Sequence, residues 1–123
     1  MNQKDSGVKR AVKGDEVWVV LNQVKADQWE VHKNFLSNIL VPAAKKVVPA
    51  EMGNTRFLFP NEPNEDGTFT SVFLMDPVVE NGNYSILDIL KRAYGEKQGE
   101  EYYKLWTEPL VTDQVGYSVI QST

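Results

Sequence analysis

The chain of 123 residues contains no cysteine and only one histidine, His32. The absence of thiols excludes disulfides and cysteine chemistry. Zinc sites usually draw on cysteine and histidine ligands, so a metal site here would have to rely on carboxylates, and we expect none. The sequence also lacks a nucleophile–base–acid order, a phosphate-binding loop and a dinucleotide fingerprint, which argues against serine and nucleotide chemistry.

Long apolar runs are missing as well. None approaches the roughly 20 residues that a membrane-spanning helix needs. The N-terminal stretch MNQKDSGVKRAVKGDE lacks the apolar segment of a signal peptide. We therefore expect a cytoplasmic protein with no membrane partner, although a signal peptide removed beforehand would leave no trace.

The charge is unevenly distributed. Residues 1–14 carry a net charge of +3, which leaves −7 for the remainder of a chain whose total is −4. An acidic body repels phosphate backbones, so no nucleic-acid partner is expected. We predict a flexible polar tail over residues 1–14 and a single domain over residues 15–123, since 41% hydrophobic and 24% charged residues are typical of globular chains.

The first half of the chain predicts a strand, a long helix and a second strand. Residues 16–24, EVWVVLNQV, predict a strand. Side chains alternate between the two faces of a strand, and here both faces receive apolar residues. The helix is expected over residues 27–47, with Asp27 as its cap and Glu30 completing a capping box. Pro42 lies within this pattern and predicts a kink or a break. A short strand follows over residues 55–59.

The second half predicts two more strands and two helices. The polar loop NEPNEDG, residues 61–67, leads into a strand over 68–76, so the two neighbouring strands should form an antiparallel hairpin. Ser85 is expected to cap a helix over residues 86–94 that Gly95 ends. A helix over residues 96–107 and a strand over 115–121 complete the chain.

The order β-α-β-β-α-β is that of the ferredoxin-like α+β fold, a four-stranded antiparallel sheet with helices on one face. The strands are apolar on both faces, and the helices can cover only one. An uncovered apolar sheet would exceed the apolar patches that soluble monomers usually tolerate. We therefore predict a homodimer that packs two sheet faces together.

The chain resembles the dimeric α+β barrel superfamily, and within it the antibiotic-biosynthesis-monooxygenase-like branch. The resemblance is carried by WVVLNQVK, WEVHKNFLSNILVPAAKK, TRFLF…TFTSVFLMD and VGYSVIQS, and it covers roughly residues 15–122. It implies a dimeric barrel with a ligand cavity between the sheet and the helices of each subunit. Members include cofactor-independent monooxygenases, haem-degrading enzymes and ring-rearranging enzymes, and fold alone does not choose among them.

Two polar residues in apolar surroundings are the predicted catalytic residues. The helical phase points His32 toward the sheet, where its imidazole would act as a general base or bind a substrate oxygen. Asn22 interrupts the first strand and would orient the ligand. The alternatives are a packed core histidine, hydrogen bonded to a neighbour, and an asparagine that begins a turn.

Aromatic residues are the predicted substrate-binding residues, although aromatic side chains at such spacings are also typical of a core. They are Trp18, Trp29, Phe73, Tyr102, Tyr103 and Trp106. Arg56 at the start of a strand would either hold an anionic group or remain solvated.

These features leave three functions open. The first is a small-molecule-binding homodimer that acts as a cofactor-independent monooxygenase or isomerase on an aromatic or apolar substrate. The second is a non-catalytic ligand-binding or sensing dimer. The third, haem binding, is disfavoured: haem-degrading relatives use an asparagine on the first strand but ligate haem with a histidine after the hairpin, and this chain has none there. No cofactor is therefore expected.

Overall fold

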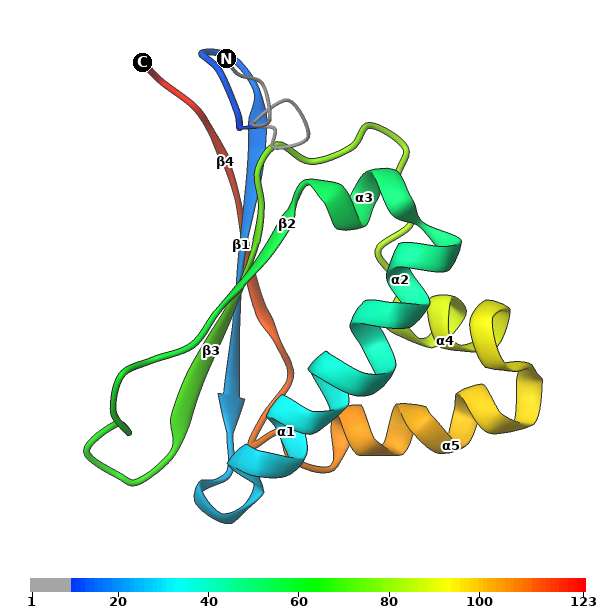
Figure 1. The fold of residues 1–123 in the computed structure, drawn as a ribbon. Coiled ribbons are helices and arrows are strands. Elements are labelled where there is room, and N and C mark those ends of the chain that lie inside the picture. The colour runs from blue at the N-terminus through cyan, green and yellow to red at the C-terminus, as the bar shows by residue number, and fades with distance from the viewer. Residues whose placement is uncertain (1–9) are drawn as a thin grey trace, which may run out of the picture.

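The computed structural model describes residues 10–123 and shows one antiparallel sheet with every helix packed on the same side of it (Figure 1). The strands are β1 (Glu16–Val24), β2 (Thr55–Leu58), β3 (Phe69–Met75) and β4 (Val115–Ile120), arranged in the order β2-β3-β1-β4. The α+β class, the β-α-β-β-α-β order and the antiparallel hairpin predicted from the sequence are confirmed.

The region between β1 and β2 is a nearly continuous helical segment in which 3₁₀, α and π turns follow one another. A 3₁₀ turn (Ala26–Gln28) leads into α1 (Trp29–Phe35), a π turn (Leu36–Leu40), α2 (Val41–Val47) and the short α3 (Pro49–Gly53). The predicted capping box at Asp27 is wrong: Asp27 lies inside the 3₁₀ turn, and no side chain caps that turn or α1. The helical segment instead begins at Ala26, one residue before Asp27, through backbone hydrogen bonds such as that from Gln28 N to Lys25 O.

The irregularity predicted at Pro42 takes the form of the π turn. Pro42 has no amide proton to donate and its ring crowds the preceding turn, so the α-helical ladder cannot continue unchanged. The Val41 amide instead bonds to the Leu36 carbonyl, five residues back. The Tyr94 hydroxyl donates to the Ile39 carbonyl at 2.8 Å, which joins the π turn to the helix over residues 86–94.

The second helical region follows its sequence signals closely. Helix α4 (Ile86–Tyr94) begins where the Ser85 hydroxyl accepts the Asp88 amide at 3.2 Å, and Gly95 ends it with φ at +95°. Helix α5 (Glu96–Thr107) runs back toward the sheet. The two helices pack closely because Gly99 lies directly against the backbone of Lys91.

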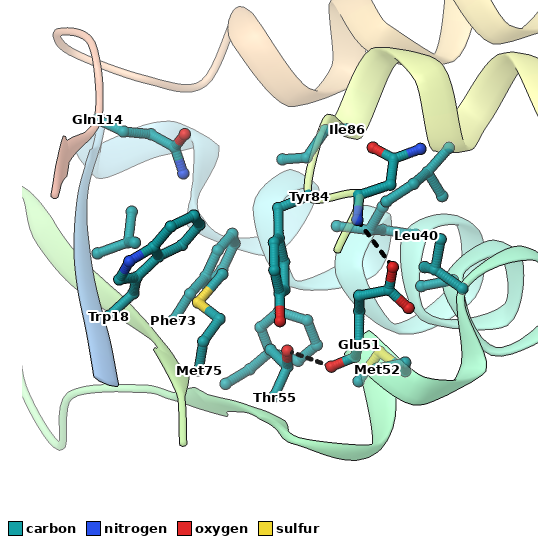
Figure 2. Close-up of a pocket in the computed structure, with 16 residues that line it drawn as sticks. Trp18, Leu40, Glu51, Met52, Thr55, Phe73, Met75, Tyr84, Ile86 and Gln114 are labelled. Atoms are coloured by element: carbon teal, nitrogen blue, oxygen red, sulfur yellow. Dashed lines mark hydrogen bonds between the residues drawn. The ribbon is translucent and has the colours of Figure 1, made fainter. Parts of the chain in front are cut away.

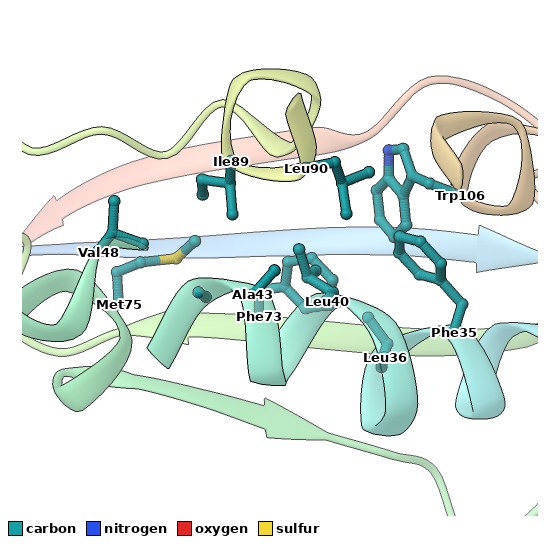
Figure 3. Close-up of a cluster of buried hydrophobic side chains, with 11 residues drawn as sticks. Phe35, Leu36, Leu40, Ala43, Val48, Phe73, Met75, Ile89, Leu90 and Trp106 are labelled. Carbon is teal, nitrogen blue, oxygen red and sulfur yellow. The ribbon is translucent and has the colours of Figure 1, made fainter. Parts of the chain in front are cut away.

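The core fills the layer between the sheet and the helices (Figure 3). Phe35 and Leu36 reach it from the first helical segment and Leu90 from α4, and each is at most 1% exposed. Burying side chains of this size contributes about 1.5–3 kcal/mol each. The aromatic rings of Phe73 and Trp106 lie 5.6 Å apart and join β3 to α5.

The other face of the sheet carries no helix among residues 10–123 (Figure 1). The pairing register aligns apolar side chains from all four strands on this face, which we call the open face. They are Val17, Val19, Leu21, Leu58, Val72, Leu74, Val115, Tyr117 and Val119. No helix of residues 10–123 combines the length and the apolar character needed to cross a bilayer.

The predicted tail falls largely on residues that the structure does not describe. Residues 1–9 lie outside the described part of the chain. Within the remainder, Ala11 N donates to Asp76 Oδ1 at 2.7 Å and Gly14 N to Gln121 O at 2.8 Å. The backbone of residues 11–14 is therefore hydrogen bonded to the end of the sheet.

Replacing Gly99 by alanine should destabilise the protein by about 1–3 kcal/mol, since the added Cβ would lie 2.7 Å from the Lys91 backbone and force α4 and α5 apart. Chemical denaturation measures the change. Gly53→Ala is the matched control, because a Cβ at that helical position meets nothing within 4 Å. Equal stability of the two variants would contradict the close packing of α4 on α5.

Candidate functional site

A cavity of about 160 Å³ lies between the sheet and the helices. Its sheet wall consists of Trp18 and Val20 from β1, Phe57 from β2, and Phe73 and Met75 from β3. Leu40 of the π turn, Ala44 of α2 and Ile89 of α4 form the opposite wall (Figure 2). The π turn at Pro42 thus shapes one side of the cavity.

Aromatic rings dominate the interior of this cavity. Tyr84, from the loop before α4, lies 5.2 Å from Trp18 between ring centroids. Phe57 and Phe73 meet edge to face at 4.8 Å. Such surfaces bind flat apolar groups by dispersion and by quadrupole contacts at ring edges and faces.

Polar groups occupy the rim of the cavity. Glu51 of α3 lies on the helix side, where one oxygen of its carboxylate accepts the Asn83 amide at 2.7 Å (Figure 2). The Tyr84 hydroxyl oxygen accepts the Val79 amide at 2.9 Å. Burial, and to a lesser extent the negative charge of Glu51, raises the pKa of Tyr84, so its phenol keeps its proton at neutral pH.

A chain of hydrogen bonds leads from Gln114, an exposed residue on this rim, into the interior of the protein. The Gln114 side-chain amide donates to Asn22 Oδ1 at 2.8 Å, and Asn22 Nδ2 lies 3.3 Å from Ser71 Oγ. Ser71 Oγ in turn lies 2.8 Å from His32 Nε2. Asn22, Ser71 and His32 are all fully buried. The two predicted catalytic residues are thus joined through a serine that the sequence analysis did not single out.

His32 is enclosed by aromatic rings. Its imidazole stacks on Trp29 with 5.5 Å between centroids and lies 5.9 Å from Trp106. Its Nδ1 atom is buried and has no hydrogen-bond partner among the described residues. Burial lowers the pKa of His32 to about 4, so the ring is neutral at physiological pH.

The remaining predicted site residues divide between four places. Trp18 and Phe73 line the cavity. Trp29 lies beside His32, and Tyr102 packs edge to face on Tyr94 at 4.9 Å. Tyr103 and Trp106 line a second, more open hollow with Gln114, which borders both spaces. The catalytic roles of His32 and Asn22 stay predictions, since neither side chain lines the cavity.

Glu51, Tyr84 and Gln114 are site residues that the sequence analysis missed. They come from a short helix and two loops, where side-chain direction follows no period. The available signal was helical spacing: Glu51 follows Ala44 by seven residues and Leu40 by eleven, and both of these line the cavity. Arg56 lies on the open face, where Nη2 pairs with Asp76 Oδ2 at 2.7 Å, so it does not contribute to the cavity.

The residues present do not fit a haem. The cavity is well below the roughly 300–1,000 Å³ of pockets for larger ligands. The single histidine is fully buried and does not line it. Within residues 10–123, no three histidine or acidic side chains are grouped as a metal site would require.

The environment of His32 should make stability depend on pH between about 6.5 and 4. Because the folded-state pKa lies below the unfolded value, unfolded chains bind the proton first, and acidification through this window should cost on the order of 3 kcal/mol. The stability that the neutral His32 ring contributes to the folded chain is fully present above pH 6.5. Denaturation at several pH values should show a shallower dependence for His32→Phe than for the native chain, and identical slopes would contradict the neutral buried imidazole.

Comparison with known proteins gives one similarity. No family model matches the sequence, and no curated protein matches it. Among solved structures, the chain is similar to a putative antibiotic biosynthesis monooxygenase from Caulobacter crescentus CB15, with a TM-score of 0.49 and 12% sequence identity over 90% of this chain and 92% of that one. The name of that protein is the name of the branch that the sequence resembles, and the match assigns neither a family nor an activity to this chain.

Proposed function

We propose that the protein binds a small apolar or aromatic molecule, about the size of one ring, in the cavity between its sheet and helices. The observation that carries this proposal is the aromatic lining by Trp18, Phe73 and Tyr84 of a space of about 160 Å³. A dry apolar cavity of roughly this volume accommodates benzene in a well-studied protein. A single ring therefore fits this volume.

Calorimetry or ligand-observed NMR with benzyl alcohol tests this proposal. An eight-atom ligand in a largely preformed pocket should bind with a Kd of roughly 0.1–1 mM. Ala44→Leu, which places three more carbons at the cavity wall, should weaken binding at least tenfold. The variant's thermal unfolding should remain cooperative, which shows that loss of binding is not loss of fold. Equal affinity in both proteins, or none in the native chain, would contradict the proposal.

We also propose that two copies associate through their open faces. The nine apolar side chains form the centre of this face, and polar or charged residues such as Gln23 and Arg56 lie around them. An apolar centre with a polar rim is the usual anatomy of an interface. A second copy presents the same flat apolar surface, so a two-fold pairing of sheets would cover both faces at once.

Native mass spectrometry should give a species at twice the 14.0 kDa of the chain. Tyr117 is 53% exposed on the open face, so Tyr117→Lys should leave the subunit folded and convert the dimer to a monomer. Leu105→Lys, at a 37% exposed position of α5, is the matched control and should remain dimeric. A native chain that is monomeric at micromolar concentration would overturn this part of the proposal.

A catalytic role, as a cofactor-independent monooxygenase or isomerase, is the second candidate. The hydrogen-bond chain from Gln114 to His32 favours it, because it links a neutral imidazole to the rim of the cavity. In this role His32 and Asn22 would position Gln114 against the ligand. Turnover of a bound ligand that is unchanged in His32→Phe would exclude His32 from the reaction.

A further inference from the structure

The cavity has one formally charged side chain on its wall, Glu51, and no lysine, arginine or histidine lines it. Glu51 is a half-buried residue on the helix side of the cavity. It takes part in none of the ion pairs among residues 10–123. Its one side-chain hydrogen bond there, from the Asn83 amide, engages a single oxygen. A carboxylate in this position lacks the cationic partner that such a group usually has when it is taken out of water.

The neighbours of Glu51 favour a positive charge as well. Aromatic faces attract cations electrostatically, and Trp18 and Tyr84 stand side by side in the cavity, 5.2 Å apart between centroids. Figure 2 shows Tyr84 between Trp18 and the Glu51 carboxylate. The net charge of −4 on the whole chain acts in the same direction.

From these observations we propose that the ligand is a small arylalkyl amine, a single ring with its amino group on an alkyl carbon, bound as its ammonium cation with the ring on Trp18 and Phe73 and the ammonium group on Glu51. This proposal rests on the proposed function and specifies the class of ligand for the same cavity. It makes Glu51 the residue that determines specificity by charge. An anionic ligand of the same size would be repelled by the carboxylate and would find no cation on the cavity wall.

Three single-ring probes that differ mainly in charge test the proposal: benzylamine, benzyl alcohol and benzoate. In the native protein benzylamine should bind about tenfold more tightly than benzyl alcohol, because a partly buried ion pair adds to the shared contacts of the ring. Benzoate should bind at least tenfold more weakly than benzyl alcohol. Isothermal titration calorimetry at one pH and ionic strength measures all three affinities.

Glu51→Gln is the discriminating variant. Glutamine keeps an oxygen that can accept the Asn83 amide, so the loop before α4 should hold its position. The variant should bind benzyl alcohol as the native chain does and bind benzylamine no more tightly than benzyl alcohol. A preference for benzylamine that survives in Glu51→Gln would overturn the assignment of Glu51, and equal native affinities for the two probes would overturn the charge preference itself.

The outcomes separate this inference from the function on which it rests. Binding of none of the three probes contradicts the cavity as a ligand site, whereas binding of benzyl alcohol without a preference for benzylamine contradicts only the charge selection. If Glu51→Gln does not fold, the salt dependence of the native protein decides. Raising the salt concentration should weaken benzylamine severalfold and leave benzyl alcohol unchanged, and equal salt responses would contradict the ion pair.

Discussion

The sheet carries apolar side chains on both faces, and the helices cover only one of them. This constraint governs the rest of the structure. In β1, Trp18 and Val20 point toward the helices while Val17, Val19 and Leu21 point away. The helical layer therefore has to seal the inner face alone, from segments joined by short connections. No helix of residues 10–123 covers the outer face, which is the surface that we propose pairs with a second copy.

The helical layer seals the inner face unevenly, and the cavity is the result. At one end of the sheet, near Val24 of β1, helices α1 and α5 lie close to the strands. There Trp106 of α5 packs against Phe35, Phe73 and His32. Toward the other end the π turn and Pro42 redirect the helical segment, and the loop before α4 contributes Tyr84 instead of a helix. The cavity remains there, lined by Trp18, Tyr84 and Glu51. The buried polar residues Asn22, Ser71 and His32 lie where the two regions meet.

Sequence patterns predicted the features that depend on periodic burial. The apolar pattern of residues 16–24 predicted β1 with the bounds observed. Ser85 and Gly95 predicted the two ends of α4, because a helix cap and a positive φ depend on the local residues. The Asp27 cap failed because backbone hydrogen bonds of a 3₁₀ turn replaced it. The pairing of His32 with Asn22 through Ser71 depends on the register of β1 with β3, which periodicity does not specify. Glu51, Tyr84 and Gln114 converge from irregular segments, so their meeting is a property of the folded chain.

The most direct test of the account uses the three tryptophan indole signals in a ¹⁵N–¹H NMR spectrum during titration with benzyl alcohol. Trp18 lines the cavity, whereas Trp29 stacks on His32 and Phe69 away from it. A ligand held between the sheet and the helices should shift the Trp18 indole signal and leave that of Trp29 in place. Shifts confined to Trp29, or no shift of any indole signal at saturating ligand, would contradict a binding site in the cavity.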